Sequence, residues 1–335
     1  MKNQNPNLKD VAKKAGVSIA TVSRALNYPE KVDSTTLTRI NKVIKEINYK
    51  PNRVAQRLRI KGGNRKIIGL LVPDIQNPFY VEVVRGVEDY AYSMNYALLM
   101  SNFAQNKEKE KMYLDIMKSE SVDGLIVAPY DEHDAEVISL IKEGIPTVCV
   151  DRGLANVNVD TILVDNENGA FEAVELLIQK GHNRIAYIGG LPSIPTSQQR
   201  KDGYVKALVK NNIKVDEKLI RFGDSKHESG KKIARELLKL KNAPTAIFAG
   251  NNLITLGALE TIHSLGLSIP KDVAVIGFDD MPWAISLNPP LTAVKQPGYE
   301  IGKQAAGLLY QRIMDPEKLS AKTILNTELI IRSSC

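Results

Sequence analysis

The sequence predicts a small helical N-terminal module followed by a two-lobed body of doubly wound α/β folds. Two short helical patterns separated by a glycine open the chain, and from residue 66 onward apolar runs alternate with amphipathic helical stretches. Charge divides at the same point: residues 1–66 hold 16 Lys+Arg against 4 Asp+Glu, whereas the other residues hold 29 against 34. This asymmetry indicates a phosphate-contacting head on a mildly acidic body.

The first helix is predicted from its cap and its apolar face. Asn7 can accept hydrogen bonds from the first-turn amides, and Asp10 follows three residues later, as in a capping box. The apolar residues that share one helical face are Val11, Ala12 and Ala15. Gly16 can adopt the left-handed conformation that ends the helix and turns the chain sharply.

A second helix is predicted to begin after Ser18 and to have one inward and one outward face. Its inward residues, at spacings of three and four, are Val22, Ala25 and Leu26. The residues left facing outward or sideways are Ile19, Ala20, Thr21, Ser23 and Arg24. Asp33 then caps a third helix that runs through Ile47.

The outward face of the second helix suits the major groove of B-DNA. Arg24 can donate twice to a guanine edge, Ile19 and Ala20 offer apolar contacts to thymine methyls, and we expect Thr21 and Ser23 to hold phosphates. The pattern alone is also typical of any small three-helix bundle.

A short basic segment at residues 51–59 follows the head and can form about two helical turns, which are marginal in water without a partner. We therefore expect a hinge that folds on DNA, followed by a linker containing Gly62 and Gly63. A flexible linker throughout is the alternative.

The body is predicted from apolar runs that polar or turn residues close, as in buried parallel strands. These runs are IIGLLVPD, YALLMSNF, DGLIVAPY, IPTVCVD, RIAYIGG, TAIFAGN and VAVIGFDD. Helical stretches lie between them at residues 80–94, 107–119, 169–179 and 227–240. The pattern occurs twice, which predicts two lobes whose ligand lies beyond the carboxyl ends of the strands.

Composition excludes several classes of protein. No apolar run approaches the length of a membrane span, and MKNQNPNLKD lacks the apolar core of a signal peptide, so we expect a cytoplasmic protein with no membrane segment. Cys149 lies in an apolar run as a small core residue, and no Cys/His cluster has metal-ligand spacing. GxGxxG, Walker and GxSxG motifs are absent, so we expect no enzymatic activity.

Two N-terminal stretches, DVAKKAGVSIATVSRALN (10–27) and NYKPNRVAQRL (48–58), resemble the DNA-binding head of the LacI/GalR (lactose-repressor) family of bacterial regulators. One departure is Leu37, where the family often has arginine. The resemblance continues through the body, in VPDIQNPFY (72–80), LVDNENGA (163–170), GHNRIAYIGG (181–190), QRKDGY (199–204), IGFDDMPWA (276–284) and NPPLTAVKQP (288–297).

The resemblance implies how the chain is divided. It implies a helix-turn-helix domain at 1–50, a hinge helix and linker at 51–65, and an effector-binding and dimerisation domain at 66–335. The upper lobe is expected at about 66–165 and 296–322, and the lower lobe at about 166–295 and 323–335. The implied fold of the body is that of periplasmic binding proteins.

The resemblance also implies contacts to DNA and to an effector. To the DNA-contacting residues it adds Asn27, and in the hinge Asn52, Ala55 and Leu58, the last wedged at a central step of the duplex. The implied effector-binding residues are Asp74, Phe79, Tyr80, Asp151, Arg200, Asn251, Asp279 and Gln296. Arg200 would clamp hydroxyls or a carboxylate, and Asp279 would accept from adjacent sugar hydroxyls.

Each candidate has a structural alternative. Asp and Asn after strands are also turn formers and helix caps, a role we assign to Asp165 and Asp280, and Phe79 can be core. The family usually has Asn-Asp where this chain has Asn251-Asn252, which removes a charge near the site.

The implied function is a repressor whose affinity for a pseudo-palindromic double-stranded operator is changed by a sugar or sugar derivative. A homodimer is expected to bind, without a resident cofactor, and no tetramerising helix follows TELIIRSSC. Two alternatives stay within regulators: a global catabolite-control protein with a phosphorylated protein corepressor, and a purine-responsive repressor. Gly307, where that global class has an arginine, weakens the first. A transport binding protein and an enzyme are the rivals from other classes.

Overall fold

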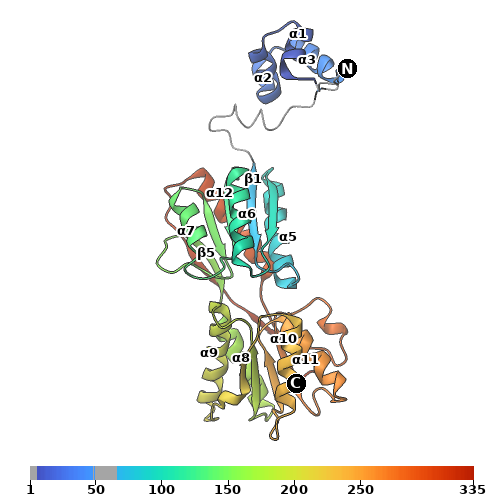
Figure 1. Cartoon of the computed structure of the whole chain (residues 1–335), viewed down its shortest axis with the longest axis vertical. Coiled ribbons are helices and arrows are strands. Elements are labelled where there is room, and N and C mark those ends of the chain that lie inside the picture. The colour runs from blue at the N-terminus through green and yellow to red at the C-terminus, as the bar shows by residue number, and fades with distance from the viewer. Residues whose placement is uncertain (1–5, 48, 50–65) are drawn as a thin grey trace. The chain divides into compact units, whose positions relative to one another are not determined.

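A computed structural model of the chain describes residues 6–47, 49 and 66–335 (Figure 1). The chain divides into two compact units, Met1–Arg65 and Lys66–Cys335, called here the head and the body. The predicted hinge helix, with Asn52, Ala55 and Leu58, lies outside the described residues.

The head contains the three predicted helices, α1 (Leu8–Ala15), α2 (Ile19–Asn27) and α3 (Ser34–Glu46), with a 3₁₀ turn at Pro29–Lys31. Asn7 and Asp10 form the predicted capping box, and Gly16 has a φ of 63°, in the left-handed region. Ser18 and Asp33 accept hydrogen bonds from the backbone amides of Thr21 and Thr36, as N-caps do.

The small core of the head comes from the faces that the spacing predicted. Val11, Val22 and Ile40 have no exposed surface, and each comes from a different helix. Leu37 packs against the same core, so the departure from the family's arginine contributes apolar contact here.

The body contains two parallel sheets. Their strands are β1 (Ile67–Val72), β2 (Ala97–Asn102), β3 (Gly124–Val127), β4 (Thr147–Val150), β5 (Asp160–Val164), β6 (Ile185–Gly189), β7 (Ile220–Phe222), β8 (Ala246–Ala249), β9 (Ala274–Phe278), β10 (Thr292–Lys295), β11 (Lys322–Leu325) and β12 (Glu328–Ile330). The upper sheet has the order β11-β5-β4-β3-β1-β2, and the lower sheet β12-β10-β9-β8-β6-β7. Only β12, an edge strand, pairs antiparallel among the described ladders.

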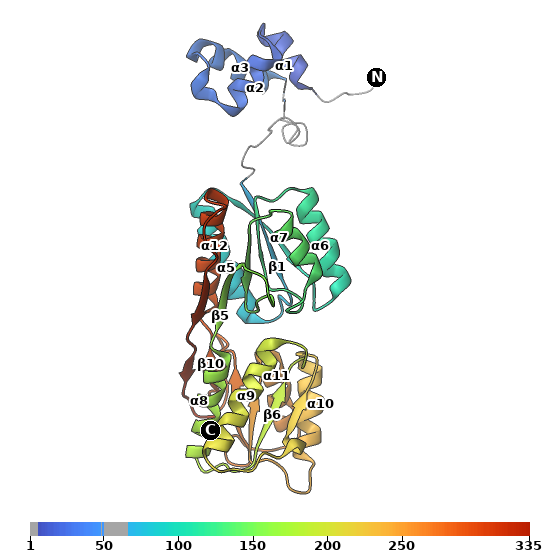
Figure 2. The ribbon, with the colours of Figure 1, turned by 90° about the vertical axis from the view of Figure 1, so that its left-hand side faces the viewer.

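Helices cover both faces of each sheet, which explains why the central strands are apolar on both sides. They are α5 (Pro78–Ser93), α6 (Lys107–Ser119), α7 (Ala135–Lys142), α8 (Asn166–Gln179), α9 (Pro195–Lys210), α10 (His227–Leu238), α11 (Asn252–Ser264) and α12 (Gly298–Met314), with 3₁₀ turns at Glu217–Leu219 and Ala284–Ser286. In the upper lobe α5 and α12 pack on one face, and α6 and α7 on the other (Figure 2). In the lower lobe α8 and α9 oppose α10 and α11.

The chain crosses between the lobes three times. The crossings lie between β5 and α8, between β10 and α12, and between β11 and β12. The third corrects the expectation that the lower lobe resumes at residue 323, because β11 pairs with β5 along residues 322–325 and belongs to the upper sheet. The crossing follows at residues 326–327.

Three pairs of helices approach closely enough to require glycine. A Cβ on Gly302 of α12 would lie 2.0 Å from the carbonyl oxygen of Val83 in α5, one on Gly203 of α9 would lie 2.1 Å from that of Glu167 in α8, and one on Gly257 of α11 would lie 2.2 Å from that of His227 in α10. None of these distances is compatible with a side chain, so the backbones of each pair are in direct contact. No helix of the described residues is long and apolar enough to cross a membrane.

Candidate functional sites

Helix α2 exposes the residues predicted to read DNA. Ile19, Ala20 and Arg24 are exposed, and Ile19, a large apolar side chain, is 38% accessible in the absence of DNA. Thr21 and Ser23 are half-buried, and the Thr21 hydroxyl lies 2.8 Å from that of Ser18. Thr21 is thus part of the cap of its own helix, a role in addition to the predicted phosphate contact.

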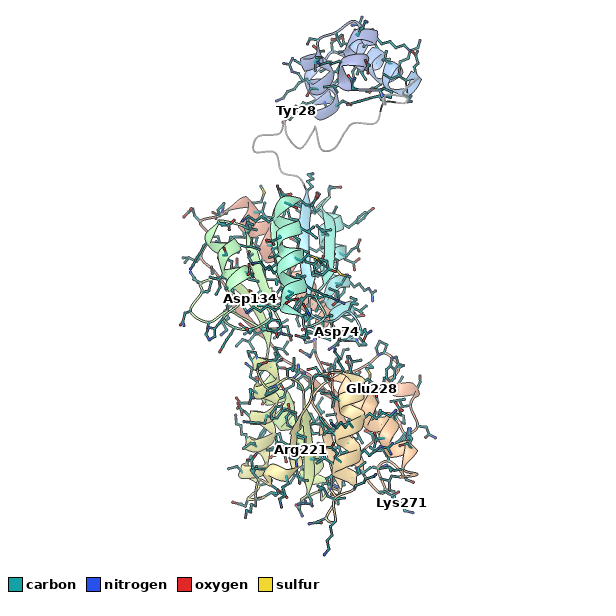
Figure 3. The ribbon with its side chains drawn as sticks, viewed as in Figure 1. Tyr28, Asp74, Asp134, Arg221, Glu228 and Lys271 are labelled. Carbon is teal, nitrogen blue, oxygen red and sulfur yellow. The ribbon has the colours of Figure 1, made fainter. Side chains whose placement is uncertain are left out.

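The body contains a cavity of about 670 Å³, including its open mouth, where the two lobes meet. The cavity lies at the carboxyl ends of the strands of both sheets, as expected for parallel sheets. Figure 3 shows Asp74 at this junction, directly after β1. All the candidate effector-binding residues lie together in its wall: Asp74, Phe79, Tyr80, Asp151, Arg200, Asn251, Asp279 and Gln296.

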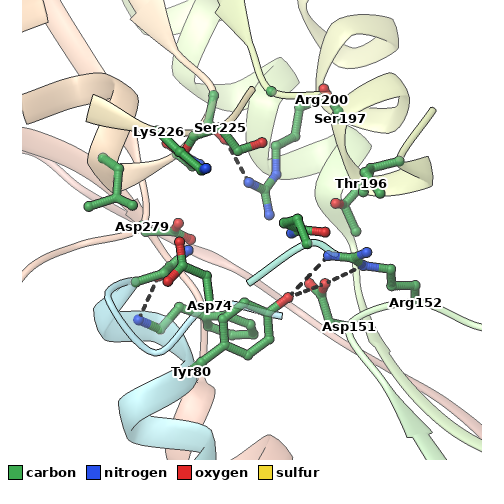
Figure 4. A pocket seen from close by; sticks show the side chains of 18 of the residues that line it. Asp74, Tyr80, Asp151, Arg152, Thr196, Ser197, Arg200, Ser225, Lys226 and Asp279 are labelled. Carbon is green, nitrogen blue, oxygen red and sulfur yellow. Dashed lines mark hydrogen bonds and ion pairs between the residues drawn. The ribbon is translucent and has the colours of Figure 1, made fainter. Parts of the chain in front are cut away.

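The upper wall holds a buried network of three side chains (Figure 4). The Tyr80 hydroxyl donates to Oδ2 of Asp151 over 2.7 Å, and Nε of Arg152 donates to the same oxygen over 3.2 Å. Nη1 of Arg152 donates to the carbonyl oxygens of Pro129 and Tyr130. Arg152 therefore neutralises Asp151 and fixes its orientation.

Burial sets the ionisation of this network. It raises the pKa of the Tyr80 phenol well above its ordinary value, and the Asp151 carboxylate adds to the effect. Burial acts to lower the pKa of Arg152, but Tyr80 and Asp151 outweigh it and the pKa is raised. Tyr80 therefore remains a neutral hydrogen-bond donor and Arg152 a cation.

Arg200 is held rigidly in the lower wall. Its Nε donates to Oδ1 of Asn166 over 2.8 Å, and its Nη1 donates to the carbonyl oxygen of Gly250 over 2.6 Å. The guanidinium lies 3.7 Å from the ring centroid of Phe278, a stacking arrangement that suits arginine better than lysine. The cation is therefore presented to the cavity in one orientation.

Asp279 follows β9 with a φ of 75°, a left-handed conformation that costs a non-glycine residue energy and is typical of functional positions. Its carboxylate accepts from Nε2 of Gln296 and from the backbone amide of Asn252. Burial raises its pKa, while the Arg200 charge and these hydrogen bonds act in the opposite direction. Asp151, in the facing wall, has a φ of 65°.

Several candidates also have structural roles. Asn251 caps α11 by accepting from Ile254 N–H and donates to the Ser225 carbonyl oxygen. Asp165 caps α8, as expected. Asp280 is neither a turn former nor a cap: its two oxygens accept from both terminal nitrogens of Arg332 at 2.7 and 2.9 Å. The expected turn or cap role was wrong because the partner of Asp280 is Arg332, which lies 52 residues away and is not indicated by any local sequence pattern.

One hydrogen bond joins the lobes beside the cavity. Nδ2 of Asn252 donates to Oδ1 of Asn77 over 2.7 Å, and the same oxygen accepts from Phe79 N–H as the cap of α5. Because the capping atom must be an oxygen, the atom of Asn252 that faces it is the nitrogen. An aspartate at 252, the family's usual residue, could not donate this bond.

Sequence reasoning missed part of the wall. The cavity is also lined by Asn77, Gln105, Arg152, Gly190, Ile194, Thr196, Ser197, Asp224, Ser225, Lys226, Gly250 and Leu253. Arg152 could have been found, because it directly follows Asp151 at the end of a strand. Thr196 and Ser197 lie in the first turn of α9, which no apolar run indicated.

The described residues contain no group of three or more His, Cys, Asp or Glu side chains placed to hold a metal ion. Cys149 is fully buried, as predicted, and burial raises the pKa of its thiol to about 12. The cavity offers a set of fixed hydrogen-bonding groups whose buried charges balance, which suits binding.

Comparison with known proteins decides the family. Residues 65–333 match the family described as periplasmic binding proteins and sugar binding domain of LacI family, and residues 7–52 match the bacterial regulatory proteins of the lacI family. The chain belongs to the LacI family. This confirms the resemblance found in the sequence and the predicted fold class, a helix-turn-helix head and a two-lobed α/β body.

Relatives of this LacI-family chain cover it almost completely. The HTH-type transcriptional repressor CytR of Escherichia coli (strain K12) is 36% identical over 331 residues, which cover 98% of this chain and 95% of CytR. A structure of the lac repressor dimer bound to operator and the anti-inducer ONPF has a TM-score of 0.84 at 28% identity and covers 99% of both chains. The transcriptional regulator CelR–cellobiose complex has a TM-score of 0.76 at 30% identity and covers 98% of this chain and 100% of CelR. The coarse function is therefore that of a transcriptional regulator.

Proposed function

We propose that this chain is a repressor whose affinity for operator DNA changes when a small sugar or sugar derivative binds between its lobes. The observation that carries the proposal is the cavity wall, in which Arg200 and Asp279 from one lobe face the Tyr80–Asp151–Arg152 network of the other. Guanidinium and carboxylate groups held in fixed positions suit hydroxyl groups, which both donate and accept. The structure of the CelR–cellobiose complex supports a sugar.

The proposed DNA-binding residues are Ile19, Ala20, Thr21, Ser23, Arg24 and Asn27 of α2, together with Asn52, Ala55 and Leu58 of the hinge. A homodimer would place two heads on the half-sites of a pseudo-palindromic operator, as the lac repressor dimer supports. The proposed division remains a head at 1–50, a hinge and linker at 51–65, and an effector domain at 66–335.

The effector acts only if it binds one arrangement of the lobes better than the other. A thousandfold change in operator affinity requires about 4 kcal/mol of coupling between the two sites. Because the cavity wall comes from both lobes, a ligand that contacts both walls has a different affinity for each arrangement. That difference is the source of the coupling.

The test is fluorescence anisotropy of a labelled pseudo-palindromic duplex with a central CG step, titrated with the full chain at several salt concentrations. We expect tight binding that weakens steeply with salt, because about 6–10 phosphate contacts release counterions. Pentoses, hexoses, their phosphates and purine bases are then added singly. A sugar that changes operator binding supports the proposal. A purine that changes it would support the purine-responsive alternative instead.

Two outcomes would contradict the proposal. Binding that no small molecule changes would redirect the search to a protein corepressor, the global-regulator alternative. Absence of binding at low salt across varied half-sites would contradict the DNA-binding assignment itself. The Lys232→Ala variant, which removes an exposed cation of α10, is the matched control for substitutions in α2.

A further inference from the structure

The cavity wall contains buried acceptors that lack a donor. Oε1 of Gln296 and Oε1 of Gln105, both in the wall, have no hydrogen-bond partner among the described residues, and neither has the Ser197 hydroxyl. Gln296 is 7% exposed and donates through Nε2 to Asp279, which fixes its amide so that the unpartnered atom is the oxygen. A buried polar atom without a partner costs free energy, so such a wall favours a ligand that supplies donors.

A fourth unpartnered acceptor lies beside the cavity. Asn252 is 1% exposed, and its Nδ2 is engaged by Asn77, so its unpartnered atom is also the oxygen. The carboxylates of Asp74 and Asp279 add further acceptor atoms to the wall. Hydroxyl or N–H groups of a ligand could pair with these unpartnered oxygens, whereas a ligand oxygen that can only accept could not.

The buried charges of the wall already balance. Asp151 and Arg152 form an ion pair at 3.2 Å, and Arg200 and Asp279 are a second cation and anion of the same buried wall. The remaining charged wall residues, Asp74, Asp224 and Lys226, are at least partly exposed. A further buried negative charge would have no fully buried counter-ion left, and its desolvation would be uncompensated.

We infer that the effector is an uncharged molecule rich in hydroxyl or N–H donors, and that phosphorylated sugars and other anions are excluded. The inference rests on the proposed function, because it assigns the ligand class of the same cavity. It narrows "sugar or sugar derivative" to neutral polyhydroxyl compounds, including free sugars and nucleosides, and it names Gln296 and Asp279 as the residues that select against anions.

The test uses matched pairs that differ only in a phosphate: glucose and glucose 6-phosphate, ribose and ribose 5-phosphate, adenosine and AMP, and fructose and fructose 6-phosphate. Binding of each compound to the full chain is measured by isothermal titration calorimetry, and its effect on operator binding by anisotropy. In any pair that binds, we expect the neutral member to bind at least about tenfold more tightly.

Asp279→Asn gives a second test, in which the direction of the change in ligand affinity distinguishes a neutral from an anionic ligand. Removing the carboxylate takes a strong acceptor from a neutral donor-rich ligand, so its affinity should fall by about tenfold or more. For an anionic ligand the same change removes repulsion and would strengthen binding. Asp202→Asn, on the same helix as Arg200 but largely exposed, is the matched control and should leave affinity unchanged.

The outcomes separate the two claims. Tighter binding of a phosphorylated member, or stronger binding of any ligand by Asp279→Asn, would overturn the inference and leave the proposed sugar-responsive function standing. If no member of any pair binds while the operator is still bound, the sugar-responsive function fails and the inference fails with it. Neutral-member preference together with loss of affinity in Asp279→Asn supports both.

Discussion

Glu110 on α6 is fully buried beside a second acid, so replacing it with glutamine should change how the body's stability depends on pH. Its Oε1 and Oδ2 of Asp134 both accept from Tyr130 N–H at 3.0 Å. Burial, with the adjacent Asp134, raises the pKa of Glu110 to about 9 from an ordinary 4.5, against the opposing influence of Arg152. In Glu110→Gln the carbonyl can keep the Tyr130 contact and the amide can donate to Asp134.

The magnitude follows from proton linkage. Between the ordinary and the raised pKa the folded state holds one proton more than the unfolded state, so this group's contribution to the free energy of unfolding falls as pH rises. The slope is about 1.4 kcal/mol per pH unit. Glutamine does not titrate, and the slope should disappear from the variant. Measuring above pH 7 avoids the titration of His182. Burial lowers the pKa of His182, so its contribution to the free energy of unfolding rises with pH, opposite to that of Glu110.

The assay is chemical unfolding of the full chain at fixed protein concentration, followed by tryptophan fluorescence at pH 7.0, 7.5, 8.0 and 8.5. Trp283 is the only tryptophan and lies in the body, so its signal reports the body and not the head. Glu108→Gln, in the first turn of the same helix but exposed, is the matched control. We expect the control to keep the wild-type slope.

Equal slopes in wild type and Glu110→Gln would refute the reasoning, because they would mean that Glu110 is ionised in the folded protein. A steeper slope in the variant would do the same.

Three further predictions concern DNA, the lobe contact and helix packing. Arg24→Ala should weaken operator binding by about 1–3 kcal/mol and relax specificity at one base pair, measured by anisotropy on single-site operator variants. Asn252→Ala removes the hydrogen bond to Asn77, worth about 1 kcal/mol, and should weaken binding of whichever sugar the anisotropy titration identifies about fivefold, measured by calorimetry. Unchanged affinity would mean that the contact between the lobes is not coupled to the ligand. Gly302→Ala places a Cβ 2.0 Å from a carbonyl oxygen and should lower the denaturant midpoint clearly. Gly307→Ala on the same helix should not, because the nearest atom to its Cβ would lie 3.6 Å away, at an ordinary contact distance. Equal midpoints for the two glycine variants would contradict the close packing.

The elements that the sequence predicted well are those with a strong local signal. Caps and a left-handed glycine are recognised from adjacent residues, so the head could be predicted almost to the residue. The central strands β1, β3, β4, β6, β8 and β9 are continuous apolar runs. Two of the edge strands lack that signal: β7 has three residues, and β11 is half exposed, because an edge strand is covered by a neighbour on only one side. The edge strand β2 keeps the signal, in the run YALLMSNF.

The site was predicted in position rather than in detail. Strand ends are visible in the sequence, and the candidates that the resemblance implied line one cavity at those ends. The contacts that decide their chemistry are long-range. Arg200 stacks on Phe278, Asn252 donates to Asn77 and Asp280 pairs with Arg332, and no local pattern encodes these pairs.

The glycine contact between α5 and α12 has a mechanical consequence. Helices whose backbones touch cannot slide without a clash, so the upper lobe should turn as a single stiff piece about the three crossings. The cavity lies at the end of β1, and the chain enters the lobe at that strand's other end. Helix α5 alone spans about 24 Å, so a turn of about 5° at the crossings displaces the far end by about 2 Å. The upper lobe would then amplify movement at the cavity. A slight narrowing of the cavity would displace the amino end of β1, where residue 66 follows the hinge and linker, by a distance comparable with a hydrogen-bond length.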